Sequence, residues 1–149
     1  MAAYFLDTST VVKRYVQESG TAWVQALAAP MVRHSLFVVR ITLAETVAAI
    51  TRRERGGSIT PHDAATAVAD FQLDFARQYR VVEVSPGLVA QAATLARRHG
   101  LRGYDAVQLA AVLEIHATDA SMTLLSADAE LNTAALAEGL LVDDPNSHP

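Results

Sequence analysis

Short apolar runs alternate along the chain with longer segments of helical periodicity, and this alternation limits the fold more than any other feature. Strands are predicted over residues 3–7, 32–38, 80–84, 122–125 and 140–142. Helices are predicted over residues 9–18, 20–29, 42–55, 60–79, 86–99, 104–116 and 127–138. Strands that are joined through helices pair in parallel, and the helices cover both faces of the sheet. The sequence therefore predicts an α/β fold with a mostly parallel sheet.

Several predicted helices carry their own start and stop signals. Thr60-Pro61 and Ser85-Pro86 each place a capping hydroxyl before a proline in the first helical position. Gly56-Gly57 and His99-Gly100 follow the last periodic residues of two helices, where glycine commonly ends a helix. The segment 104–116 is apolar almost all round, which predicts a central, buried helix.

The length of 149 residues fits one domain, which we place at residues 1–145, with a flexible tail over 146–149. The chain has no cysteine, which excludes disulfides, thiolate catalysis and cysteine-type zinc or iron–sulfur sites. No apolar run reaches the roughly 18 residues of a membrane span, and no signal peptide is recognisable. We therefore expect a cytoplasmic protein that makes no use of a membrane.

Charge is distributed unevenly around a net value of −4. All 12 basic residues, of which 11 are arginine, lie in residues 1–102, whereas residues 103–149 hold eight acids and no base. One interpretation is a solvated acidic C-terminal part. The other is a bipolar molecule, with arginines for a phosphate backbone on one side and acids for a metal or a basic partner on the other. Arg52, Arg53 and Arg55 fit either a solvated helix end or an RNA-backbone contact.

Four carboxylates lie at the ends of apolar runs or in the first turns of predicted helices: Asp7, Glu45, Asp105 and Asp128. In a parallel α/β domain these positions gather along one edge of the sheet. Four acids in one place repel one another unless a divalent cation neutralises them. Oxygen ligands without suitably spaced histidines favour Mg²⁺ or Mn²⁺ over zinc. The pattern therefore indicates a hard-metal site and phosphate chemistry.

Each acid also has a simpler interpretation. Asp7 can cap the helix that follows it, and Thr42-x-x-Glu45 matches a capping box. Asp105 can complement a helix dipole, and Asp128 suits the start of a helix. Capping and metal binding can coexist, because a carboxylate has two oxygens.

Two serines, Ser9 and Ser126, lack a histidine base in a recognisable position, so a nucleophilic role is disfavoured. We expect them instead to hydrogen-bond the carboxylates and orient them as metal ligands.

These motifs, taken in order, resemble those of PIN-domain ribonucleases. They are Asp7-Thr8-Ser9, Leu43-Ala44-Glu45, Tyr104-Asp105-Ala106-Val107-Gln108-Leu109-Ala110 and Leu124-Leu125-Ser126-Ala127-Asp128. Size and motif order are similar to the VapC toxins of bacterial type II toxin–antitoxin pairs, over residues 3–145. The resemblance implies a five-stranded sheet in the order 3-2-1-4-5 and a homodimer. It also implies Mg²⁺- or Mn²⁺-dependent endonucleolytic cleavage of RNA, and neutralisation by a cognate DNA-binding antitoxin.

The resemblance also implies roles for individual residues. Asp7 and Asp105 would be the principal metal ligands, and Glu45 would complete the site and help orient the attacking water. Asp128 would support a second metal or its water. Arg40 stands before the second motif, where small or apolar residues are common in the family. We name Arg40, together with Lys13 and Arg14, as candidate substrate contacts.

Two other functions compete with this hypothesis. A haloacid-dehalogenase-type phosphatase also begins with an aspartate at a strand end, but it needs a second aspartate two residues on, where this chain has Ser9. It also needs a late lysine, and Lys13 is the only lysine. A non-catalytic PIN-fold domain that uses the acidic pocket only to hold a partner is the other alternative.

Overall fold

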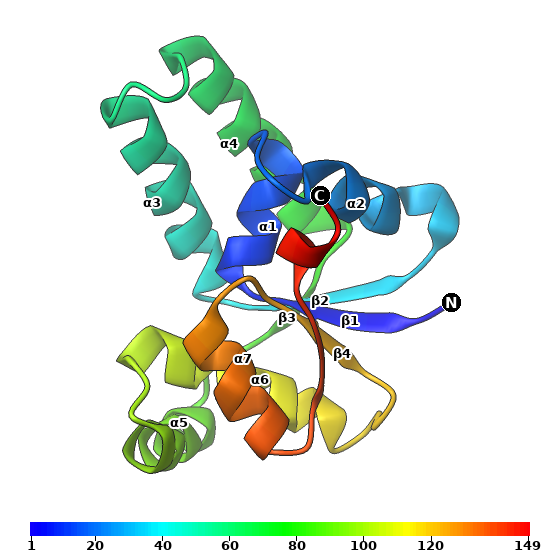
Figure 1. Ribbon diagram of the computed structural model, residues 1–149, viewed down its shortest axis with the longest axis vertical. Helices are drawn as coiled ribbons and strands as arrows, with labels where there is room; N and C mark the ends of the chain where they lie inside the picture. The colour runs from blue at the N-terminus through cyan, green and yellow to red at the C-terminus, as the bar shows by residue number, and fades with distance from the viewer.

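Five parallel strands form one sheet in the computed structural model, which describes all residues 1–149 (Figure 1). They are β1 (Ala3–Leu6), β2 (Ser35–Val39), β3 (Arg80–Val82), β4 (Thr123–Leu125) and β5 (Leu141–Asp143). The order is β3-β2-β1-β4-β5, and every pairing is parallel. This confirms the predicted sheet and its order. The order reverses between β1 and β4, which makes the carboxyl ends of these two strands the topological switch point.

Helices cover both faces of the sheet, as predicted. Figure 1 shows one group of helices on one face of the sheet and a second group on the other. The first group is α1 (Thr8–Tyr15), α2 (Thr21–Ala28), α3 (Thr42–Arg55) and α4 (Pro61–Arg77). The second is α5 (Pro86–His99), α6 (Gly103–His116) and α7 (Ala129–Ala137). The distal ends of α3 and α4 extend beyond the sheet as a helical hairpin (Figure 1).

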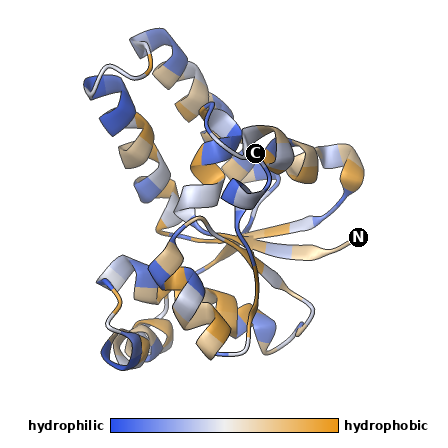
Figure 2. Cartoon of the chain, viewed as in Figure 1, coloured by the Kyte–Doolittle hydropathy of each residue, from blue (hydrophilic) through white to orange (hydrophobic).

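Successive residues of the central strands serve opposite faces of the sheet, because side chains alternate along a strand. Phe5 and Leu124 belong to the core that packs against α5, α6 and α7. Leu6 and Leu125, the next residue in each strand, belong to the core beneath α1, α2 and α4. The central strands are therefore mostly apolar on both of their faces (Figure 2). This double burial fixes the strand ends, and so fixes the residues that follow them.

The predicted helix caps are present. The Thr60 hydroxyl accepts a hydrogen bond from the Asp63 amide, and the Ser85 hydroxyl accepts one from the Leu88 amide. Gly100 ends α5 with a φ of 67°, a left-handed conformation that glycine adopts without strain. Val112 and its neighbours on α6 are fully buried, which agrees with the central helix expected from its composition. None of the helices combines the length and the apolar character needed to cross a membrane.

The start of the second strand differs from the sequence-based expectation. The second strand begins at Ser35 rather than at residue 32, because Pro30–Val32 form a 3-10 turn that ends at Arg33 with a φ of 60°. At the C-terminus the chain makes defined contacts, and the flexibility expected of residues 146–149 stays a prediction. Pro145–Ser147 form another 3-10 turn, and the His148 ring stacks on Trp23 with 4.1 Å between ring centres.

Candidate active site

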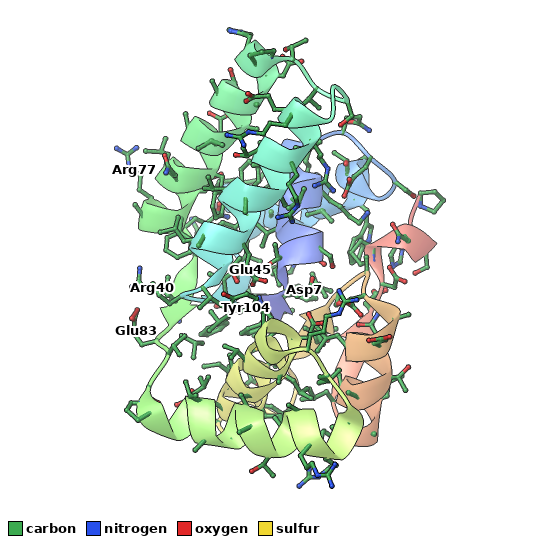
Figure 3. The ribbon with its side chains drawn as sticks, turned by 90° about the vertical axis from the view of Figure 1, so that its left-hand side faces the viewer. Asp7, Arg40, Glu45, Arg77, Glu83 and Tyr104 are labelled. Atoms are coloured by element: carbon green, nitrogen blue, oxygen red, sulfur yellow. The ribbon has the colours of Figure 1, made fainter.

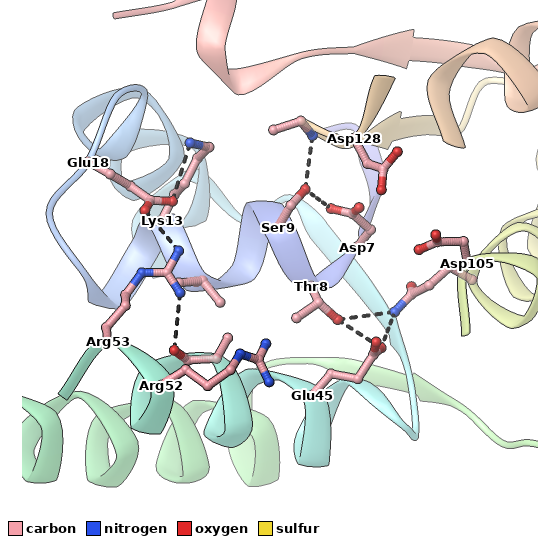
Figure 4. A pocket seen from close by; sticks show the side chains of 14 residues that line it. Asp7, Thr8, Ser9, Lys13, Glu18, Glu45, Arg52, Arg53, Asp105 and Asp128 are labelled. Atoms are coloured by element: carbon pink, nitrogen blue, oxygen red, sulfur yellow. Dashed lines mark hydrogen bonds and ion pairs between the residues drawn. The ribbon is translucent and has the colours of Figure 1, made fainter. Parts of the chain in front are cut away.

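A pocket of about 410 Å³ lies at the carboxyl ends of β1 and β4, where the strand order reverses (Figure 4). All four predicted carboxylates line it: Asp7, Glu45, Asp105 and Asp128. They come from the loop after β1, from α3, from α6 and from the loop after β4. The sheet edge therefore brings together acids that are up to 121 residues apart in the sequence.

Asp7 is the most constrained of the four. It is buried directly after β1 and caps α1 by accepting a hydrogen bond from the Thr10 amide at 3.1 Å. Its Oδ1 also accepts from the Ser9 hydroxyl at 2.6 Å, and its Oδ2 accepts from the Ser126 hydroxyl at 2.8 Å. Burial nevertheless raises the pKa of the Asp7 carboxyl to about 6, against the lowering effect of these donors. The site thus holds a carboxylate whose negative charge is only partly compensated.

The two serines tie Asp7 to the loop after β4. Ser9 accepts a hydrogen bond from the Ala127 amide at 2.9 Å, and Ser126 accepts one from the Asp128 amide at 3.1 Å. Asp128 in turn caps α7 through the Leu131 amide at 3.0 Å. Both serine hydroxyls therefore donate to Asp7, and the same network positions Asp128.

Glu45 does not form the capping box that its spacing from Thr42 suggested. Helix α3 begins at Thr42 without a side-chain cap, so this local interpretation is wrong. The Glu45 carboxylate instead accepts hydrogen bonds from the Thr8 hydroxyl at 2.9 Å and the Gln108 amide at 3.0 Å (Figure 4). The buried Thr42 hydroxyl accepts from the same Gln108 amide at 3.1 Å. Glu45 is thus held toward the pocket by residues from α1 and α6.

Asp105 occupies the first turn of α6 and is half-buried. Burial raises the pKa of its carboxyl, and the charges of Asp128 and Glu45 raise it further. Asp128 also contributes to the raised pKa of Asp7. These shifts show that the acids repel one another across the pocket, which is the situation a cation relieves.

Positive charge reaches the pocket from α1 and α3. The buried Lys13 ammonium lies 3.3 Å from the Glu18 carboxylate, and Arg53 lies 3.1 Å from the other oxygen of Glu18. Glu18 thus neutralises part of both charges. Arg52 also lines the pocket but is exposed and takes part in no ion pair or hydrogen bond through its side chain. Arg52 is therefore the cation most available to a substrate.

Two of the three candidate substrate contacts lie away from this pocket. Arg14 is held between α1 and α4, where it contacts Asp74 at 3.3 Å and donates to Gln78 and Tyr79. Arg40 is exposed and forms an ion pair with Glu83, and neither residue lines the acidic pocket (Figure 3). Only Lys13 of the three lines the acidic pocket. The geometry thus favours Arg52 over Arg14 and Arg40 as a phosphate contact.

The donor set fits a hydrated hard cation. Every acidic ligand supplies oxygen, and the mutual repulsion of the acids favours a bound positive charge. No three of the side chains form a closed set of metal ligands in this arrangement. Mg²⁺ retains several waters and commonly uses only one or two carboxylates directly, and the pocket has room for such an ion. Asp7 and Asp105 would hold it, with Asp128 and Glu45 acting directly or through water.

Sequence reasoning missed the residues that hold Glu45. Thr8 and Gln108 were quoted only as parts of motifs, although both contact this carboxylate. Gln108 lies one helical turn after Asp105, so it shares a face with that acid, and this spacing was the available signal. It is also 98% buried on a mostly apolar helix, and its carbonyl oxygen has no hydrogen-bond donor. A buried polar side chain of this kind commonly has a positioning role.

Comparison with known proteins assigns the family. A model of the PIN domain matches residues 4–136. Because this match spans most of the chain, the protein belongs to the PIN domain family.

Among curated relatives, the chain is 32% identical over 142 residues to ribonuclease VapC45 of Mycobacterium tuberculosis strain CDC 1551 / Oshkosh. It has the same identity to ribonuclease VapC49 of strain ATCC 25618 / H37Rv, and each match covers 95% of both chains. The predicted similarity to VapC-type proteins is therefore confirmed, and the phosphatase alternative finds no support.

Solved structures with the same fold include FitAB bound to a DNA fragment, with a TM-score of 0.67 and 16% identity over 95% of this chain and 94% of that one. VapC20 of Mycobacterium tuberculosis, described as a sarcin–ricin loop cleaving toxin, has a TM-score of 0.64. It is 19% identical, and the match covers 88% of this chain and 94% of that one. These distant structures show that the fold is shared.

Proposed function

We propose that this protein is an endoribonuclease that requires Mg²⁺ or Mn²⁺ and acts as the toxin of a toxin–antitoxin pair. The observation that carries the proposal is the convergence of four carboxylates on one pocket at the switch point of the sheet. The names of the 32% identical relatives support RNA as the substrate. The catalytic unit would be residues 1–145.

The residues of the pocket have distinct roles in this proposal. A bound Mg²⁺ or Mn²⁺ would polarise the scissile phosphate and neutralise charge that develops there. Asp7 and Asp105 would hold the ion, while Ser9 and Ser126 keep the Asp7 oxygens fixed. Glu45, held by Thr8 and Gln108, is placed to accept a proton from the attacking water. Asp128 adds negative charge on the opposite wall of the pocket.

The proposed partner is an antitoxin that covers this pocket. Several structures that share the fold are toxin–antitoxin complexes, among them VapBC2 of Rickettsia felis bound to a DNA fragment from their promoter. An acidic pocket favours a basic side chain from the partner, since such a group would replace the cation. We expect a homodimer that binds antitoxin in a larger assembly.

Cleavage of a cellular RNA pool tests the proposal. Wild type, an Asp7→Asn/Asp105→Asn double variant and an Asp70→Asn control would each be incubated with Mg²⁺, Mn²⁺ or EDTA. Asp70 is exposed on α4 and outside the pocket, so it controls for an aspartate-to-asparagine change. Discrete fragments from wild type and the control alone, and only with metal, are the expected result. Absence of cleavage by antitoxin-free wild type would favour the non-catalytic partner-binding alternative.

A further inference from the structure

A second pocket of about 380 Å³ opens beside the acidic pocket. The two pockets share Thr8, Glu45 and Arg52 in their linings, so they form one continuous surface. A ligand bound at the four carboxylates can therefore extend into the second pocket. The volume lies within the range of about 300–1,000 Å³ that is usual for small-ligand sites.

The other walls of this second pocket are apolar. Ala44 and Ala48 are one turn apart on the exposed face of α3, and Ile41 lies at the start of that helix. Tyr104 of α6 stands opposite them with its side chain 66% exposed, next to the active-site residue Asp105. Figure 3 shows Tyr104 near Glu45, with which it lines this pocket. The pocket thus combines one exposed aromatic side chain with small and apolar side chains.

The residues that line this pocket favour a ligand with a planar group that stacks on Tyr104 and a negatively charged group that pairs with Arg52. The Tyr104 ring offers a stacking surface, and no protein side chain stacks on it in this structure. Arg52, which has no ion-pair partner, supplies a cation at the junction with the acidic pocket. A nucleotide combines both requirements, because its base stacks on aromatic rings and its phosphate pairs with arginine.

We propose that the second pocket binds the nucleobase next to the scissile phosphate, stacked on Tyr104, with Arg52 on the neighbouring phosphate. This inference rests on the proposed RNA cleavage and names a subsite for it. Ile41, Ala44 and Ala48 offer no hydrogen bonds to a base edge, and the Thr8 hydroxyl already donates to Glu45. Stacking on Tyr104 is therefore the contact expected to carry most of the affinity for the base.

The test uses an RNA oligonucleotide that spans a cleavage site mapped in the RNA-pool experiment. Fluorescence anisotropy would give its Kd in Ca²⁺, with a gel to verify that the RNA stays intact. Single abasic residues are then placed at each position around the scissile phosphate. With wild type we expect one position at which loss of the base weakens binding by about 10-fold.

Four variants assign that effect to the pocket. Tyr104→Ala is expected to weaken binding of the intact RNA by the same factor of about 10, and to abolish the effect of that abasic position. Tyr104→Phe keeps the ring and the affinity. Ala48→Leu fills the floor and weakens binding, as Tyr104→Ala does. Val89→Ala is the matched control, because Val89 lines the other apolar surface that Tyr104 touches but is absent from this pocket.

Two results would overturn the inference while leaving the proposed nuclease intact. Tyr104→Ala could leave RNA affinity unchanged, which would leave the pocket to a protein partner. Alternatively, the losses of affinity caused by Tyr104→Ala and by the abasic residue could be fully additive, which would show that this base does not bind at Tyr104. Wild type that neither binds nor cleaves RNA would instead reject the proposed function and the subsite together.

Discussion

The two sides of the active-site pocket are built differently. On the strand side, Asp7 follows β1 directly and Asp128 lies three residues after the end of β4. Both are fixed by Ser9, Ser126 and main-chain amides. On the helix side, the first turns of α3 and α6 present Glu45, Asp105 and Tyr104, and the last turn of α3 presents Arg52. These four side chains are exposed or half-buried. The strand side holds one deeply buried charge, whereas the helix side is open to solvent.

This difference suits the strand side to metal binding and the helix side to substrate recognition. Hydrogen bonds that join two adjacent strand ends leave Asp7 little freedom, which suits a ligand whose position must not change. The helix side carries the aromatic ring, the free arginine and the apolar floor, and these suit recognition of a variable polymer. The predictions below test this contrast, from the largest expected effect to the smallest.

Asp7→Asn should remove the central group of the strand side. Cleavage of RNA is expected to fall by at least about 100-fold, because the amide keeps the shape but loses the charge that holds the cation. Initial rates with saturating Mg²⁺ measure the loss, and Asp70→Asn provides the reference. Activity within about threefold of wild type would remove Asp7 from the metal site.

The stability of metal-free protein should depend on pH through Asp7. Its pKa is about 6 in the folded protein and near 3.8 when unfolded, so the folded state holds this proton over a wider pH range. The contribution of protonated Asp7 to the free energy of unfolding is complete below about pH 3.8, and it is lost as the pH rises through about 6. The total loss is on the order of 3 kcal/mol. Urea unfolding of wild type and Asp7→Asn in EDTA, from about pH 4 to about pH 8, isolates this contribution. If the difference in free energy of unfolding between wild type and Asp7→Asn stays constant with pH, the raised pKa of Asp7 is contradicted.

Gln108→Leu should affect the helix side without unfolding the protein. Leucine fills a similar volume and removes a carbonyl oxygen that has no donor, but the buried Thr42 hydroxyl loses the donor that Gln108 supplied. The free energy of unfolding should therefore fall by about 1–3 kcal/mol. Glu45 loses one of its two donors, and kcat should fall about 10-fold while KM changes little. Steady-state kinetics separate the two parameters. An unchanged kcat would show that Thr8 alone suffices to hold Glu45.

Arg40→Ala should have the smallest effect. Arg40 pairs with Glu83 at the exposed surface, outside both pockets of the site. Cleavage rates within about twofold of wild type are expected, because exposed ion pairs contribute little. A loss of cleavage rate of about 10-fold or more would show that the substrate-binding surface extends to Arg40.

Local sequence signals predicted most of the fold. Thr60-Pro61 and Ser85-Pro86 act over three residues, so their caps could be recognised without tertiary information. The alternation of apolar runs and helices gave the parallel sheet, since helical connections leave few other arrangements. The position of the acids at one edge followed from that sheet.

Predictions failed where the decisive partner is distant in sequence. The Thr42-x-x-Glu45 spacing suggested a capping box, but Glu45 is held by Gln108, 63 residues away. Arg14 contacts Asp74 of α4 and Gln78 just after that helix, contacts that no local pattern reveals, and its role as a substrate contact stays a prediction. Side-chain roles of this kind depend on tertiary packing, and the sequence alone could not assign them.

Binding of Mn²⁺, followed by electron paramagnetic resonance, tests the central claim that the acidic pocket holds a divalent cation. Wild type and Asp70→Asn are expected to bind Mn²⁺ with the same affinity. Asp7→Asn should bind it at least about 10-fold more weakly. Wild type that binds no Mn²⁺, or an Asp7→Asn variant that binds it equally well, would contradict the claim.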